Sequence, residues 1–101
     1  MDNLTHATFH ENLNEDFFVR LDDSTSVKLV LIEVSELRES HRNSFFTALF
    51  RGPLEPLLPQ YLYRMENERM GLFDLFIVPV GVTEAGYEYE AVFNRLKEKT
   101  S

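Results

Sequence analysis

The segment Val27-Lys28-Leu29-Val30-Leu31-Ile32-Glu33-Val34 decides the fold class of this chain. It is rich in β-branched residues and no glycine or proline interrupts it, so it predicts a strand. The preceding residues Asp22-Asp23-Ser24-Thr25 have side chains that bond to their own backbone and favour a turn. Before this turn, Phe17, Val19 and Leu21 recur at every second position, which is the period of a strand. The sequence therefore predicts two strands joined by a turn.

Four further strands are predicted downstream. They are residues 44–51, 61–66, 72–80 and 87–94. In the first of them, Phe46, Ala48 and Phe50 share one face, and Pro79 places the end of the third at an edge or a bulge. Residues 36–42 are expected to be a polar connection, and residues 81–86 a hairpin loop. Six strands with mostly tight connections predict a mainly β fold, either a small antiparallel barrel or a compact sandwich.

The 101 residues are expected to form a single domain. We divide it into an N-terminal segment (1–15), a β body (16–94) and a polar tail (95–101). In the first segment, Leu4, Phe9 and Leu13 are spaced to share one loose helical face, with Asn3 or Thr5 as the N-cap. A short helix is therefore predicted ahead of the strands.

The composition excludes several classes of protein. The chain has no cysteine, which rules out disulfides, thiolate metal sites and thiol catalysis. Its net charge is −7, and its ten basic residues are scattered among seventeen acids. Nucleic acid and anionic membrane are bound by basic stripes, so neither is expected as a partner. The N-terminus lacks a basic and an apolar region, so no signal peptide is predicted and a cytoplasmic location is expected.

The histidines give no convincing metal site. His6 and His10 have the i, i+4 spacing that zinc can use on a helix. Ala7 stands where a zincin has glutamate, and His41 lies in a different segment. Neither a nucleophile elbow nor a glycine-rich phosphate loop is present. We therefore expect no enzymatic activity, no metal and no cofactor.

The predicted strand 44–51 ends in a cation, Arg51, and is followed by chain-breaking residues. Residues 52–60 contain three prolines and cannot pair as a central strand, but Leu54, Leu57 and Leu58 predict that this loop packs onto the body as a lid. Arg51 is expected to tie the loop to backbone carbonyls or to an acid such as Glu66, with an anion contact as the alternative.

The residues beside Arg51 are also expected to be structural. Gly52 joins a buried strand to Pro53, so a positive φ or a close backbone contact is expected there. Gln60, at the far end of the loop, is assigned a structural role together with Arg51 and this pair.

A set of motifs is spread over nearly the whole chain. These motifs are Phe46-Thr47-Ala48-Leu49-Phe50-Arg51-Gly52-Pro53, Leu58-Pro59-Gln60 followed by Tyr63, Gly71, Leu75-Phe76-Ile77-Val78-Pro79-Val80-Gly81, and Tyr89-Glu90-Ala91-Val92-Phe93-Asn94. In order and spacing they resemble a family of small bacterial proteins that is classed as a domain of unknown function. The resemblance implies a mainly β domain of bacterial or phage-related origin, often encoded near proteins with phage tail-collar domains. It implies no catalytic residues. Asn14 stands where the family pattern has glycine, and asparagine tolerates a left-handed backbone nearly as well.

Two of the predicted strands are apolar on both faces. In a sheet with one face in water, apolar and polar residues alternate, but residues 27–34 and 44–51 do not follow that rule. One face can fill the interior, and the N-terminal segment and the leucine-bearing loop are too short to cover the other face completely. We therefore expect a protein partner, or a second copy of the chain in a homodimer, to bind there. The side chains assigned to this outer face are Val30, Ile32, Val34, Phe45 and Leu49.

Two classes of function remain open from the sequence. The first is a non-enzymatic protein-interaction module, which the resemblance narrows to an assembly factor or structural component of a phage-tail-related system. The second is a small-molecule or sugar-binding β-barrel, with or without enzymatic activity. The aromatic residues available to stack on such a ligand are Tyr61, Tyr63, Tyr87 and Tyr89. A concave aromatic pocket favours the second class, and a filled interior with an apolar outer patch favours the first.

Overall fold

The structure is a computed structural model, and it describes residues 4–96. One short helix, α1 (His6–Glu11), precedes the strands. The strands are β1 (Asp16–Arg20), β2 (Ser26–Val34), β3 (Arg38–Glu39), β4 (Asn43–Gly52), β5 (Tyr61–Asn67), β6 (Gly71–Thr83) and β7 (Gly86–Leu96). The prediction of a mainly β fold with a short N-terminal helix is confirmed.

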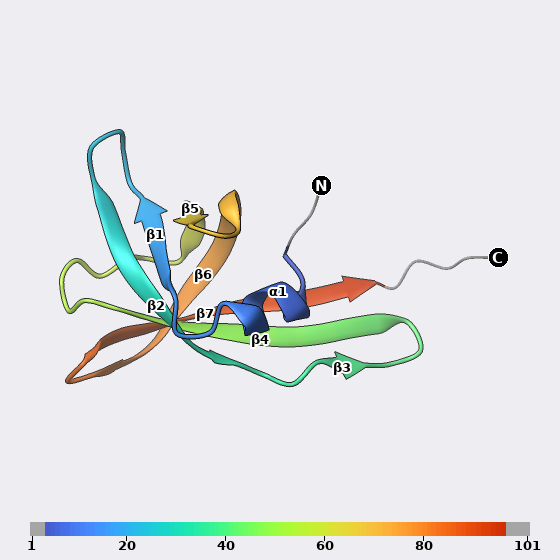
Figure 1. Ribbon diagram of the computed structural model, residues 1–101. Helices are drawn as coiled ribbons and strands as arrows, with labels where there is room; N and C mark the ends of the chain where they lie inside the picture. The colour runs from blue at the N-terminus through green and yellow to red at the C-terminus, as the bar shows by residue number, and fades with distance from the viewer. Residues whose placement is uncertain (1–3, 97–101) are drawn as a thin grey trace.

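The strands close into a barrel. Their order is β2-β1-β5-β6-β7-β4-β3, every pair is antiparallel, and an additional β2–β4 pairing joins the two ends (Figure 1). Six strands make up the closed barrel, and β3 adds only to the outer end of β4. This settles the choice that the sequence left open between a barrel and a sandwich.

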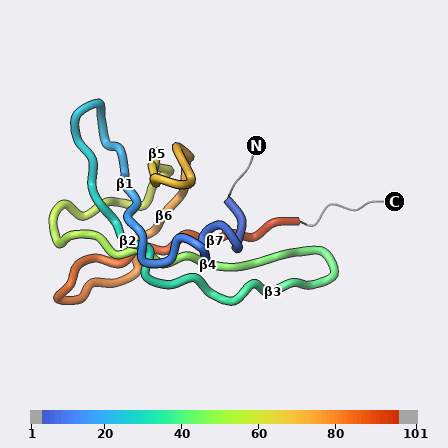
Figure 2. The backbone as a smooth tube through the Cα atoms, in the orientation of Figure 1, coloured from blue at the N-terminus to red at the C-terminus, as the bar shows by residue number. Residues whose placement is uncertain are grey.

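Two long strands turn the corner between the two halves of the barrel. β2 pairs with β1 through Ser26–Val30 and with β4 through Val30–Val34. β6 pairs with β5 through Gly71–Ile77 and with β7 only from Val78 onward. Figures 1 and 2 show the result, because β1, β2, β5 and β6 run in one direction while β4 and β7 run across it. The wall is therefore incomplete where β6 leaves β7 and where β2 leaves β4.

Irregular pairing marks both corner strands. In β6 the register shifts between Pro79 and Gly81, which confirms the bulge predicted at that proline. In β2 the register shifts between Leu31 and Glu33. This second bulge turns Val34 inward, opposite buried Ala48 and against the core. The expectation that Val34 belongs to the outer face is therefore wrong, because one extra residue reverses the alternation.

Alternate residues of the strands fill the interior. In β4 the buried residues are Phe46, Ala48 and Phe50, as predicted. The largest fully buried side chains are Tyr89, Phe9, Phe17, Phe50, Leu29, Leu31, Met65, Ile77 and Val19. They come from every strand of the barrel and from α1, so the space inside the barrel is a packed core.

The helix inserts one aromatic ring between the unpaired parts of β6 and β7. Thr5 caps it, as predicted, by accepting a 3.2 Å hydrogen bond from the Thr8 backbone N–H. Phe9 is fully buried, and its ring packs against Phe73 of β6 and Phe93 of β7, with ring centroids 6.3 and 5.1 Å away. We expected this segment to cover part of the outer face. Its Phe9 ring enters the core instead, because β6 and β7 diverge there and leave room for one aromatic ring.

Several boundaries differ from the sequence prediction. Residues 38–39 form the short β3 inside the stretch that we expected to be a connection, and β6 and β7 extend until only a tight turn separates Thr83 from Gly86. Asn14 has a φ of 71°, so the expected left-handed conformation is confirmed. Arg95 and Leu96 of the predicted polar tail belong to β7, and the rest of the tail lies outside the described residues, as does Asn3.

Candidate functional site

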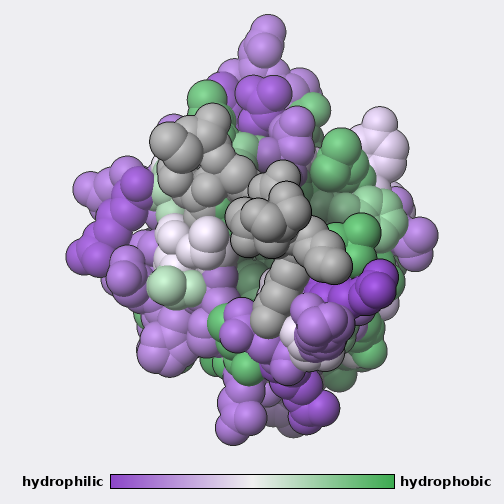
Figure 3. All heavy atoms as spheres, turned by 90° about the vertical axis from the view of Figure 1, so that its right-hand side faces the viewer, coloured by the Kyte–Doolittle hydropathy of each residue, from purple (hydrophilic) through white to green (hydrophobic). Residues whose placement is uncertain are grey.

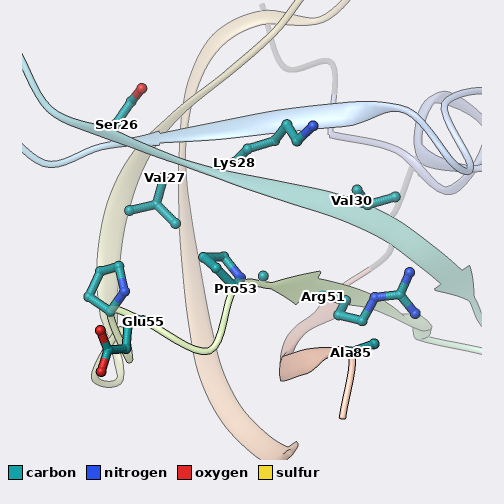
Figure 4. Close-up of a pocket in the computed structure, with 10 residues that line it drawn as sticks. Ser26, Val27, Lys28, Val30, Arg51, Pro53, Glu55 and Ala85 are labelled. Carbon is teal, nitrogen blue, oxygen red and sulfur yellow. The ribbon is translucent and has the colours of Figure 1, made fainter. Parts of the chain in front are cut away.

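A groove lies on the outside of the barrel where β2 leaves β4. It has a volume of about 380 Å³ and is open to solvent. Its walls come from β2, from the end of β4 with the following loop, and from the β6–β7 turn (Figure 4). The side chains that give it its character are Lys28, Val30, Arg51, Pro53, Pro56 and Ala85.

The groove exists because β4 stops before β2 does. The β2–β4 ladder begins at the pair Val30 and Arg51. β4 ends one residue later, at Gly52, and Pro53 has no N–H with which to continue the ladder. The first part of β2, from Ser26 to Lys28, is therefore paired with β1 only.

The glycine at this point allows two segments to approach closely. A Cβ on Gly52 would lie 2.5 Å from the Leu29 Cδ2 atom, and the Gly52 carbonyl lies directly against Gly86, so the expected close backbone contact is confirmed. The alternative expectation of a positive φ is wrong, since the positive-φ glycines are Gly71 and Gly86. A Cβ on Gly86 would collide with the Gly52 carbonyl oxygen. The two glycines thus pack the β6–β7 turn directly onto the end of β4.

Arg51 is half-buried at the edge of the groove, and its side chain extends between Val30 and Ala85 (Figure 4). Among residues 4–96 its guanidinium has no hydrogen bond and no ion pair. The expected pairing with Glu66 is wrong, because Glu66 accepts a 2.9 Å salt bridge from Arg20 on the neighbouring strand β1. The cross-strand neighbour Glu88 directs a carboxylate oxygen to within 3.9 Å of a Cβ position on Gly81, in β6.

The proline-containing loop is fixed to the barrel by one leucine. Leu58 is buried, and its backbone N–H donates a 3.0 Å hydrogen bond to the hydroxyl of Tyr89. Tyr63 donates a 2.6 Å hydrogen bond to the carbonyl of Pro59, and burial raises the pKa of the Tyr63 phenol. Leu54 and Leu57 remain about half exposed. Of the three leucines expected to pack the loop onto the body as a lid, only Leu58 is buried.

The remaining loop residue assigned from sequence is Gln60. It is exposed just before β5, and no hydrogen bond of its side chain is present in the part of the chain that the structure describes. The structure thus gives it no contact that would explain a structural role.

The histidines have contacts of their own. His6 Nε2 lies 2.8 Å from the Ser35 carbonyl oxygen, and the His6 ring packs edge-on against Phe46. The ring of His10 stacks on His6 at 5.9 Å, while His41 is exposed in the β3–β4 turn. Across residues 4–96, no three histidine, aspartate or glutamate side chains are grouped so that they could hold a metal ion.

The outer face retains apolar side chains, although not all those predicted. Phe45 is 37% exposed and Val92 is 55% exposed, whereas Val30, Ile32 and Leu49 are half-buried. On the face shown in Figure 3, hydrophobic residues form separate groups among hydrophilic ones. The sequence gives little signal for Val92, because it follows Glu88 and Glu90 at alternate positions, and alternating glutamates indicate a solvated strand face.

Residues 4–93 match a family model described as a domain of unknown function, DUF6916. The chain belongs to the DUF6916 family. This agrees with the resemblance to a domain of unknown function that the motifs indicated. The DUF6916 match spans α1 and the barrel up to Phe93 in β7, so it includes every wall of the groove.

Further comparisons add no activity to the DUF6916 assignment. No curated protein and no solved structure matches the chain. The described part of this DUF6916 domain also contains no helix that is long and apolar enough to span a membrane.

Proposed function

We propose that the protein is a non-enzymatic protein-interaction module that binds a protein partner, or a second copy of itself, through the outer face of β4 and β7. The observation that carries this proposal is the outer triad, which we define as Phe45, Leu49 and Val92. Val92 is the register partner of Thr47, which lies between the other two on β4. The three side chains therefore lie diagonally adjacent on one face, close enough to form one apolar surface.

The surroundings of the outer triad have the composition of an interface. Leu49 lies opposite Glu33 on one side and Glu90 on the other, and Phe45 lies opposite Arg38 and Asn94. An apolar centre with a polar and charged rim is the usual arrangement at protein–protein contacts. Two members of the outer triad, Phe45 and Val92, remain exposed, so neither α1 nor the proline-containing loop covers them.

The filled interior argues against the small-molecule alternative. Tyr63 and Tyr89, two of the four tyrosines proposed to stack on a ligand, are buried, and each hydroxyl is already bonded to the loop backbone. Tyr61 is 63% exposed and lies edge-on to Tyr63. The tyrosines thus form no concave aromatic pocket, and the outer triad supports an interaction function better.

The biological setting of this interaction stays a prediction. The resemblance stated from the motifs implies an assembly factor or a structural component of a phage-tail-related system, acting without a cofactor. An apolar patch on a small, acidic barrel is compatible with such a role, because assembly proteins act by binding larger partners.

The test compares the wild type with the double variant Phe45→Ser/Val92→Thr. Sedimentation velocity over a hundredfold range of concentration measures self-association, and affinity capture from the native host with mass spectrometry measures binding of other proteins. We expect the double variant to lose dimerisation, capture of a specific protein, or both. The matched control is Val82→Thr, which changes an equally exposed valine on the β6–β7 hairpin and should behave as wild type. A wild type that is monomeric throughout, and captures the same proteins as a folded double variant, would contradict the proposal.

A further inference from the structure

We infer that the groove beside β2 is a second binding site, which takes an extended acidic peptide segment of a partner protein. The segment adds as a short strand to the free edge of β2 and places a carboxylate on Arg51. This goes beyond the proposed function, because the groove contains no residue of the outer triad and can bind whether or not that surface does.

One edge of β2 is unpaired from Ser26 to Lys28. Leu31 donates its N–H to the Glu15 carbonyl and accepts a hydrogen bond from the Asn14 N–H, so its backbone faces the β1 side. Alternate residues of a strand direct their N–H and C=O groups to opposite sides, so Lys28 faces the other way, as Val30 does. Accordingly, the Lys28 carbonyl oxygen lies 3.8 Å from a Cβ position on Gly52.

From Lys28 toward Ser26, that edge carries backbone groups that pair with no strand of the barrel, and Gly52 borders it at the Lys28 carbonyl. Val30 has a register partner on this side, Arg51, but the ladder goes no further toward Lys28 and Ser26. The next residue of the opposite chain is Pro53, which has no N–H, and the loop then turns away to form the groove wall (Figure 4). A free strand edge of this kind is where extended peptides bind by strand addition.

The groove carries two positively charged side chains. Arg51 and Lys28 both line it, and neither side chain has an ion pair among the residues from 4 to 96. Glu55 is the single acid among the lining residues. In a chain with a net charge of −7, two cations without partners beside one acid form a local site of opposite sign. A half-buried guanidinium gains most from a carboxylate, to which it donates paired, charge-assisted hydrogen bonds.

The apolar lining and the size of the groove suit an extended peptide. Val30, Pro53, Pro56 and Ala85 provide apolar walls around the cations. The volume of about 380 Å³ lies at the lower end of the range for binding pockets, which suits a few residues of extended chain. A small free anion would use Arg51 but would leave the strand edge and the apolar walls without contact. A peptide that alternates acidic and apolar residues uses all three.

The experiment selects short peptides from a displayed random library on the immobilised wild-type protein. The selected sequences are then synthesised with blocked ends and titrated into isotopically labelled protein. We expect enrichment of aspartate and glutamate, and amide shifts at Lys28, Gly52 and Ala85. Arg51→Gln should weaken these peptides about tenfold, since it removes the charge-assisted contact. The matched control Arg69→Gln removes an exposed arginine in the β5–β6 turn and should leave their affinity unchanged.

Several results would overturn the inference. Selection of no peptide, of peptides without acidic residues, or of peptides whose shifts map away from the groove would each do so. Equal binding to Arg51→Gln would do so as well, provided that this variant keeps the wild-type circular dichroism and thermal midpoint. Acetate that reproduces the peptide shifts at the same concentration would show an anion site without strand addition. None of these results affects the outer triad, whose variants are measured separately.

Discussion

The hydroxyl of Tyr89 accepts a hydrogen bond of 3.0 Å from the backbone N–H of Leu58, inside the barrel. Both residues are buried, so water cannot replace the bond if it is lost. Together with the bond from Tyr63 to the Pro59 carbonyl, this contact fixes the middle of the proline-containing loop, in which Leu54 and Leu57 remain exposed. It thereby holds the wall of the groove that Pro53 and Pro56 form.

Tyr89→Phe should therefore destabilise the protein by about 1–3 kcal/mol, because it leaves the Leu58 N–H buried without a partner. Urea unfolding measures the loss, and hydrogen exchange should show a faster Leu58 amide. Tyr61→Phe is the matched control, since the Tyr61 side chain is 63% exposed, and it should change neither quantity. An unchanged unfolding midpoint for Tyr89→Phe would mean that the loop is held by other contacts.

Stability should fall in strong alkali because of Tyr63. Burial, and then repulsion from the neighbouring Tyr89 and Tyr61 phenolates, raise the pKa of the Tyr63 phenol in the folded state. The unfolded chain then loses this proton first, so the contribution to stability is complete below the ordinary tyrosine pKa, near 10, and is lost as the pH rises through the folded value. The free energy of unfolding should thus decrease with pH more steeply in wild type than in Tyr63→Phe. Parallel pH profiles would contradict this assignment.

Gly52 should not tolerate even a methyl group. Gly52→Ala places a Cβ against the Leu29 side chain and should cost about 1–3 kcal/mol by overpacking, and Gly52→Val at least as much. Gly81→Ala is the control, because the nearest atom to a Cβ there is Glu88 Oε1 at 3.9 Å, an ordinary contact. Thermal unfolding measures the difference, and the midpoint of Gly52→Ala should lie below that of Gly81→Ala. Equal midpoints would show that Leu29 moves aside freely.

The side-chain amide of Asn67 should be required for full stability of the fold. Its Nδ2 donates to the Asp16 carbonyl at 3.0 Å, while its Oδ1 accepts the N–H groups of Arg69 and Met70 at 2.9 Å each. Asn67→Asp keeps the two accepted bonds but sets a carboxylate oxygen against the Asp16 carbonyl, at a cost of about 1–3 kcal/mol. Asn94→Asp, the same change at an exposed position, should be nearly neutral in urea unfolding. A neutral Asn67→Asp would show that the contact with β1 is dispensable.

The sequence was informative where a strand follows its simple period. The inward face of β4 and the bulge at Pro79 were predicted because alternation and proline are local signals. The bulge in β2 was not predicted, because Ile32-Glu33-Val34 reads as an uninterrupted strand. The position of the extra residue depends on β4, which is remote in sequence, so Val34 was assigned to the wrong face.

The groove was predicted only in part for the same reason. The sequence Arg51-Gly52-Pro53 predicted the end of a strand, and Arg51 was expected to bind an acid or an anion there. Its expected partner Glu66 lies instead beside Arg20, because the β1–β5 register brings those two together. Lys28 and Ala85 gave no signal in the sequence, since they reach the groove only through the pairing of distant strands.

The place of β7 in the barrel sets an order on folding during synthesis. Among the described strands β7 comes last in the chain, but it pairs with β4 along the whole length of β4 and with the end of β6, and its Phe93 packs against Phe9 of α1. The earlier strands cannot close a barrel among themselves, because β4 and β6 are joined only through β7. The barrel therefore cannot close until residues 86–96 have left the ribosome's exit tunnel, and until then the apolar inner faces of the earlier strands lack their cover.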